Sequence, residues 1–179
     1  GKFKNVREGR QKKTDLWLSD PDQFLDIYTR ELGNFQKLCD NHNVKAVHRP
    51  NTISDIDWEN YDIPQQFPNM FFYDYTKRAH RLTRTPKNYR LMFSFSGVPG
   101  YQNQVKAALK TDAPISAVFN GPFPDEFLGR EVIDGDKSDL INLFKGDKKI
   151  IGLKAKGDAK KDNTGFVIHT NTIPTKEVA

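Results

Sequence analysis

The sequence comprises 179 residues, of which 36% are hydrophobic and 28% charged, with a formal net charge of +5. This length fits a single domain of roughly 100–200 residues, and the 12% aromatic share excludes a disordered chain. The one cysteine, Cys39, excludes an internal disulfide framework and a thiolate-rich metal site built from this sequence alone, while no apolar run approaches the ~18 residues of a membrane span.

The chain begins with a basic segment over residues 1–18. Residues 1–14 hold six Lys or Arg and one Glu, and their only apolar side chains are Phe3 and Val6, so this segment is a basic lead-in arm or helix. Asp20 and Pro21 then supply a helix cap and a proline at the first helical position. Apolar residues follow at spacings of three and four, which predicts a helix over about 21–41.

The remaining chain alternates short β-rich runs with polar or helical connections, which is typical of βα units and a mainly parallel sheet. We expect about seven strands, over 44–48, 70–75, 90–95, 115–119, 131–133, 149–154 and 166–169, and short helices over 54–61, 77–84, 101–110 and 137–144. The predicted fold is one α/β domain over 1–179, with a tail at 171–179. Its sheet forms a reduced or irregular (β/α) barrel, and the alternative is an open three-layer α/β sheet.

Polar residues follow most of these strands, and the carboxyl ends of parallel strands converge on one edge of a sheet. We therefore predict three catalytic carboxylates at this edge, Asp74, Asp134 and Asp136. The predicted ligand- or phosphate-binding residues are Arg49, Asn51, Asp55, Lys77, Lys154 and Lys156.

Asp134 and Asp136 flank Gly135, and two carboxylates at a strand end can hold Mg²⁺ or titrate at different pKa values. The alternative is structural, because Asp-Gly is a common turn dipeptide and Asp136 can cap a following helix. Lys154 and Lys156 lie among glycines and offer ammonium groups to a phosphate, but a charged surface hairpin explains the same residues.

Residues 77–90 contain six Lys or Arg and no carboxylate, and they follow an aromatic run at 71–75. Cations beside aromatic rings suit contact with a nucleic-acid backbone and stacking on bases. The residues predicted to make this contact are Arg78, Arg81, Arg84 and Lys87. The alternative is a helix whose basic side chains are simply solvated.

Four segments together resemble the phage gene-product-88-like proteins, a family of uncharacterised bacteriophage and bacterial proteins. They read RPNTISDIDW at 49–58, FYDYTK at 72–77, VIDGDKSDL at 132–140, and GLKAKG at 152–157 with KDNTGFV at 161–167. The resemblance covers most of the chain. It implies that six of the strand-end residues act as a set, namely Asp74, Lys77, Asp134, Asp136, Lys154 and Lys156.

The sequence departs from the family pattern in two respects. The family's first motif typically reads Arg-Leu-Asn-Gly-Thr-Ser-Asp, whereas Pro50, Thr52 and Ile53 replace three of its residues here. Similar proteins also carry a cysteine-rich segment ahead of the part where this sequence begins. We therefore expect either a minimal form or a fragment, and we transfer no metal-cluster chemistry to it.

Three functions remain open. The first is an enzyme acting on a phosphorylated or nucleic-acid substrate, with Mg²⁺ at Asp134 and Asp136. The second is a non-catalytic nucleic-acid-binding protein that uses residues 1–14 and 77–90. The third is a phage-type inhibitor or interaction protein with an acidic protein partner. In each case we expect a cytoplasmic protein without membrane contact, located in the bacterial host if it is phage-encoded.

Overall fold

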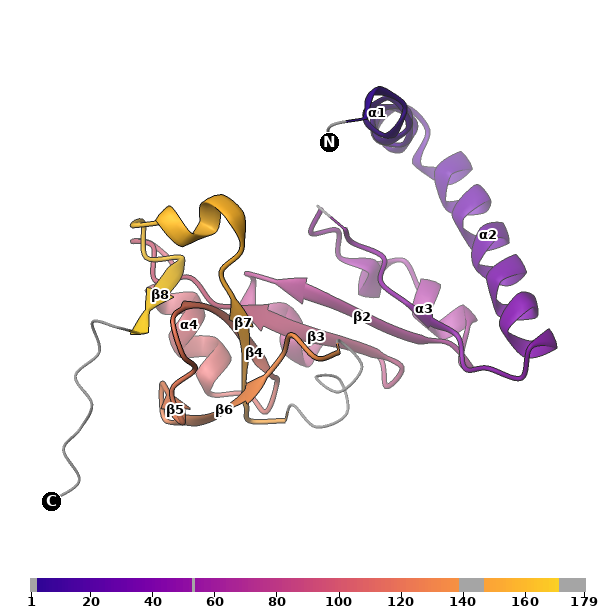
Figure 1. Ribbon diagram of the computed structural model, residues 1–179. Helices are drawn as coiled ribbons and strands as arrows, with labels where there is room; N and C mark the ends of the chain where they lie inside the picture. The colour runs from indigo at the N-terminus through magenta and orange to yellow at the C-terminus, as the bar shows by residue number, and fades with distance from the viewer. Residues whose placement is uncertain (1–2, 53, 139–146, 171–179) are drawn as a thin grey trace, which may run out of the picture.

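The computed structural model describes residues 3–52, 54–138 and 147–170. Its α-helices are α1 (Lys4–Ser19), α2 (Pro21–Asn41), α3 (Ile63–Gln66) and α4 (Gln102–Leu109), and its 3-10 helices are η1 (Trp58–Asn60), η2 (Ala79–Thr83) and η3 (Gly157–Lys161). The strands are β1 (Val47–His48), β2 (Phe71–Thr76), β3 (Tyr89–Ser94), β4 (Ile115–Asn120), β5 (Glu126–Phe127), β6 (Arg130–Asp134), β7 (Ile150–Lys154) and β8 (Val167–His169). Figure 1 shows their arrangement.

The eight strands form one sheet in the order β1-β2-β3-β4-β7-β6-β5, and β8 pairs with the carboxyl half of β4. Every pair is parallel except β5 with β6. Within the described residues the order ends at β1 on one side and β5 on the other, so the sheet is open and the barrel arrangement is not formed (Figure 1). The α/β class and the mainly parallel sheet are confirmed.

One face of the sheet carries most of the buried apolar residues. Phe72 of β2 and Leu91 of β3 pack with Leu32 and Cys39 of α2, and Trp58 of η1 belongs to the same cluster. Residues of α4 and η2 cover the strands farther along in a second cluster, which contains Phe93, Ile115, Phe119 and Ile150. Because side chains alternate along a strand, the residues between these point to the other face.

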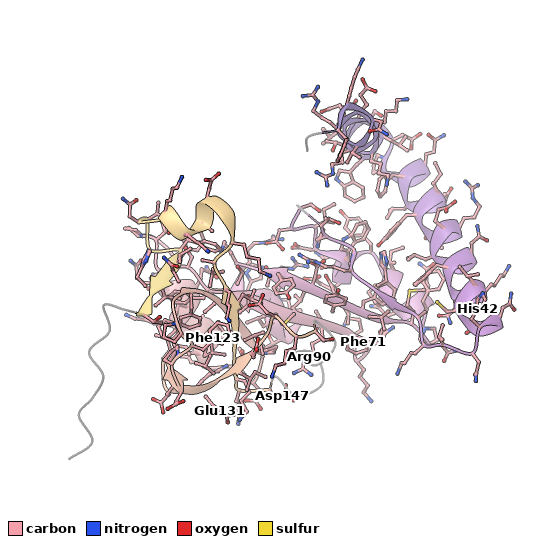
Figure 2. All side chains as sticks on the ribbon, in the orientation of Figure 1. His42, Phe71, Arg90, Phe123, Glu131 and Asp147 are labelled. Atoms are coloured by element: carbon pink, nitrogen blue, oxygen red, sulfur yellow. The ribbon has the colours of Figure 1, made fainter. Side chains whose placement is uncertain are left out.

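The second face carries a smaller apolar cluster. Met92 and Ile151 are buried there against partly buried Phe71, Tyr73, Tyr75, Ile133 and Leu153, and among the described residues no helix contributes to this cluster. Arg90 of β3 forms an ion pair with Asp147, and the two lie close together in Figure 2.

Helix α2 begins where the sequence signals predicted a helix start. The carboxylate of Asp20 accepts a hydrogen bond from the Gln23 backbone amide at 3.0 Å, and Pro21 occupies the first position of α2. The expected helix over 77–84 is instead the 3-10 helix η2, and only η1 forms within 54–61. Of the expected helix over 137–144, residues 137–138 are not helical and the rest lie outside the described residues, as does the tail at 171–179.

In the part of the chain that the structure describes, no helix is long and apolar enough to cross a membrane.

Candidate functional site

A cavity of about 570 Å³ opens at the carboxyl ends of β1, β2 and β3. We call it the strand-end pocket. Charged, amide, hydroxyl and aromatic side chains line it, namely Arg49, Asn51, Thr52, Ser54, Asp55, Tyr75, Thr76, Lys77, Arg78, Ser94, Tyr101 and Gln104. Of the sequence-predicted ligand residues, Arg49, Asn51, Asp55 and Lys77 therefore converge on one cavity, and Arg78 joins them.

Lys77 follows the last residue of β2 and reaches across to β3. Its ammonium nitrogen donates to the Ser94 hydroxyl at 3.0 Å and lies 3.3 Å from the Ser94 carbonyl oxygen. It also lies 4.8 Å from the ring centre of Phe166 and 5.6 Å from that of Tyr101. Burial lowers the pKa of Lys77. Both the carbonyl contact and the two rings favour the charged form of the side chain.

Asp74 lies beneath the pocket and organises the loop that forms its wall. The side chain is buried, with one oxygen accepting from the Asn51 backbone amide at 2.7 Å and the other from the Tyr75 amide at 3.0 Å. Burial raises the pKa of Asp74 to about 6, although these hydrogen bonds and Arg49, 3.5 Å away, act in the opposite direction. Because Asp74 has no exposed surface and does not line the pocket, the structure favours a supporting role over the predicted catalytic one.

Asn51 and Arg49 shape the same loop. The Asn51 side-chain oxygen accepts from the Ser54 hydroxyl at 2.8 Å and the Trp58 indole at 3.1 Å, and its amide nitrogen donates to the Ile56 carbonyl at 3.0 Å. Arg49 donates through Nε to the Asn51 carbonyl at 3.1 Å, and its guanidinium lies 4.6 Å from the ring centre of Tyr75. Asn51 is thus occupied by the fold, whereas Arg49 presents its guanidinium at the pocket wall.

Arg78 and Arg81 belong to an ion-pair network with three carboxylates. Arg81 binds Glu59 at 2.7 Å and also pairs with Asp55 and Asp57, while Arg78 pairs with Asp55 at 3.2 Å and with Asp57. Arg81 is completely buried, and the Arg78 side chain is 39% exposed. Arg81 is therefore a buried partner of these carboxylates, and the structure does not place its guanidinium at the surface, where the predicted nucleic-acid contact would lie.

Arg84 and Lys87 are exposed beyond η2 and do not line the strand-end pocket. Lys87 borders a separate cavity of about 320 Å³ near Tyr89 and Arg90. The six cations of the stretch 77–90 thus divide into a half-buried lysine at the pocket, three arginines paired with carboxylates, namely Arg78, Arg81 and Arg90, and two exposed cations, Arg84 and Lys87.

Asp134, the last residue of β6, and Asp136 lie in a turn beside the carboxyl end of the neighbouring strand β7. The Asp136 amide donates to the Asp134 carboxylate at 3.0 Å, and the Asp136 carboxylate accepts from the Lys154 amide at 2.8 Å and the Lys156 ammonium at 2.9 Å. The hydrogen bond from Lys156 holds the pKa of Asp136 below its usual range. The contact between the Asp136 amide and Asp134 fits the turn of the structural alternative, but residues 137–138 are not helical, and Asp136 is instead held by Lys154 and Lys156.

Gly135 explains why the turn is tight. A Cβ atom built there would lie 2.4 Å from the Ile151 methyl carbon and 3.0 Å from the Gly152 carbonyl oxygen. Among the described residues no group of three metal-ligating side chains occurs, so the predicted Mg²⁺ ligands Asp134 and Asp136 have no third partner in that set. Neither they nor Lys154 and Lys156 line the strand-end pocket. Lys154 extends over the ring of Phe123, labelled in Figure 2, at 5.8 Å.

The predicted site residues omit seven that line the pocket, namely Thr52, Ser54, Tyr75, Thr76, Ser94, Tyr101 and Gln104. Ser94 was placed inside a strand over 90–95, whereas β3 ends at Ser94. Tyr101 and Gln104 lie at the start of α4, and Gln104 accepts a hydrogen bond from the Ala79 amide at 2.8 Å. The start of the predicted helix at 101–110 follows the strand that ends at the pocket, and this position in the chain could have indicated both residues.

The sequence matches the model of one protein family, described as gene product 88, over residues 1–170. The chain belongs to the gene product 88 family. This match confirms the resemblance carried by the four sequence segments, two of which, at 49–58 and 72–77, supply walls of the strand-end pocket. No curated protein and no solved structure matches the chain. The residues that line the strand-end pocket are therefore the basis for a proposal about the function of this gene product 88 family member.

Proposed function

We propose that this protein binds a phosphorylated ligand in the strand-end pocket. The observation that carries the proposal is the position of Lys77, whose half-buried ammonium lines the cavity. Among the described residues, no carboxylate lies within ion-pair distance of it. A partly desolvated cation without a counter-charge is stabilised by a bound anion.

The charges around Lys77 are arranged to favour an anion. Arg49, Lys77 and Arg78 line the pocket, against a single lining carboxylate, Asp55. Asp55 is already bound by Arg78, Arg81 and the Thr76 hydroxyl. The other carboxylates of the region, Asp57, Glu59 and Asp74, do not line the cavity. A phosphate in the pocket would therefore meet cations and hydroxyl donors in preference to negative charge.

The volume and the aromatic lining indicate the size of the ligand. About 570 Å³ lies within the range of small-molecule sites and admits a phosphorylated molecule of mononucleotide size. Tyr75 and Tyr101 line the same cavity and offer ring surface to an apolar or aromatic part of the ligand. The crevice at the carboxyl ends of the strands is also where ligands of open parallel α/β sheets bind.

Calorimetric titration with ADP, inorganic phosphate and adenosine tests the proposal. We expect ADP and phosphate to bind and adenosine to bind far more weakly, because it lacks the anion. Lys77→Met keeps the length of the side chain and removes its charge. A hydrogen bond to a charged group contributes about 1.5–3 kcal/mol, so the affinity for ADP should fall roughly 10- to 100-fold.

Lys106→Met is the matched control, since Lys106 is exposed on α4 and does not line the pocket. It should leave the affinity for ADP unchanged. Equal affinity of the wild type and Lys77→Met for ADP, or equal binding of adenosine and ADP by the wild type, contradicts a phosphate site at Lys77.

A further inference from the structure

Helix α1 projects from the rest of the protein. None of its 16 residues is buried, and Figure 1 shows it at the far end of α2 from the sheet. Among the described residues its carboxyl end makes the aromatic contacts, where the ring of Trp17 lies 5.2 Å from Phe24, 5.9 Å from Trp58 and 5.4 Å from Tyr61. The aromatic contacts fix the direction of the helix and leave its amino-terminal three turns in solvent.

The exposed turns are strongly basic. They carry Lys4, Arg7, Arg10, Lys12 and Lys13, all exposed. The one carboxylate in 3–14, Glu8, lies 3.7 Å from Lys4, and both side chains are largely solvated. A solvated pair of this kind neutralises little charge, so the turns present most of their positive charge to a partner.

The cations are not confined to one side of the helix. Successive residues of an α-helix are rotated by about 100°, which places Arg10 and Lys13 on one side of α1 and Lys4 and Lys12 on the other. Basic and polar side chains radiate from α1 in all directions in Figure 2. A flat acidic surface would contact only one of these sides, whereas a groove with phosphates on both walls contacts both.

We propose that α1 docks into the major groove of double-stranded DNA. This groove is about 12 Å wide and admits an α-helix, and its two walls are lined by phosphates. The major groove of an RNA duplex is too narrow and deep for such entry. An unsupported helix of this length that is polar all round is marginal in water, so a binding partner would also stabilise it. The inference is independent of the strand-end pocket.

Fluorescence anisotropy with a 20-base-pair DNA duplex tests the proposal on the full chain. Two double variants each remove two cations, Arg10→Gln with Lys13→Gln on one side, and Lys4→Gln with Lys12→Gln on the other. Glutamine forms helices about as well as lysine and arginine, and circular dichroism checks that helicity is retained. Lys106→Gln with Lys110→Gln, on and just after α4, is the control with the same change in net charge.

Each α1 pair should weaken duplex binding on the order of tenfold or more at 0.1 M salt. Each should also reduce the slope of log affinity against log salt by about two, since every lost phosphate contact removes about 0.9. The control pair should change neither quantity appreciably. An effect of only one α1 pair overturns the groove geometry, and an equal effect of the control pair reduces the interaction to net charge.

Absence of duplex binding by the wild type, or tighter binding of α1 to polyglutamate than to DNA, refutes the proposal in favour of another partner. Lys77→Met should bind the duplex as the wild type does while losing affinity for ADP, and the α1 variants should bind ADP normally. If Lys77→Met loses both ligands, DNA contacts the strand-end pocket rather than α1, and the inference fails while the pocket proposal stands.

Discussion

The buried carboxyl of Asp74 should make the stability of this protein depend on pH in an unusual direction. Its pKa is raised from 3.8 to about 6 in the folded state, chiefly by burial. The folded protein therefore binds the proton more tightly than the unfolded chain does, and protonation of Asp74 stabilises the fold. This contribution is complete below pH 3.8 and is lost as the pH rises through 6.

The size of the effect follows from the shift. One pKa unit corresponds to about 1.4 kcal/mol, so a shift of roughly two units amounts to about 3 kcal/mol. Most of this, roughly 2.5 kcal/mol, should appear between pH 7 and pH 4. Other carboxyls titrate in the same range, and Asp136 and Asp162, whose pKa values are lowered, act in the opposite direction. The contribution of Asp74 must therefore be isolated by comparison.

Asp74→Asn provides that comparison. The amide cannot titrate, and its NH₂ group would face one of the two backbone amides that now donate to the carboxylate, which lowers stability by an amount independent of pH. Urea unfolding followed by tryptophan fluorescence gives the free energy of unfolding of both proteins from pH 4 to 7. On acidification the wild type should gain roughly 2.5 kcal/mol relative to Asp74→Asn.

A difference that stays constant with pH, or one that favours the variant on acidification, refutes the assignment of a raised pKa to Asp74. If Asp74→Asn does not fold, NMR titration of the Asp74 carboxyl carbon in the wild type decides the same point. A midpoint near the usual range of aspartate then contradicts the reasoning.

Three further substitutions test other parts of the structure. Arg81→Met should lower the free energy of unfolding by about 3–5 kcal/mol, because it leaves the nearly buried carboxylate of Glu59 without its partner. Arg84→Met, at an exposed position, should change it by less than about 0.5 kcal/mol, and urea unfolding of both shows whether the two arginines differ as the structure requires. Trp17→Ala should cost about 1–3 kcal/mol, since its half-buried ring joins α1 to the aromatic cluster of Trp58. It should also reduce far-ultraviolet circular dichroism at 222 nm, and an unchanged spectrum would mean that the aromatic contacts do not hold α1.

Local signals predicted the elements that depend on neighbouring residues. Helix α2 follows from Asp20, Pro21 and the apolar spacing, and the seven expected strands all occur with ends shifted by a few residues. The eighth strand, β5, is two residues long and exists only through its pairing with β6. Local sequence patterns also could not predict whether the sheet closes into a barrel, because closure requires pairing between the first and last strands of the sheet.

The convergence of Arg49, Asn51, Asp55 and Lys77 could be predicted, since parallel strands bring their carboxyl ends to one edge. The same rule grouped Asp134 and Asp136 with them, yet β3, β4 and β7 separate β6 from β2 in the sheet. Strand order therefore decides which strand-end residues share a pocket, and strand order is set by pairing between distant segments.

The sequence does not show which cations are paired with carboxylates, because the carboxylates come from segments that only the tertiary structure brings near. Lys77, Arg78 and Arg81 lie within five residues and contribute the same formal charge. The segment 55–59 reaches both arginines with three carboxylates, but Lys77 points along β3 to Ser94 instead. Because Arg78 and Arg81 are neutralised by these carboxylates and Arg49 lies 3.5 Å from Asp74, a bound phosphate would gain most from Lys77. The basic stretch that suggested a nucleic-acid surface thus places Lys77 and the carboxylate-paired Arg78 at the pocket, while the exposed cations of α1 form a separate positive surface.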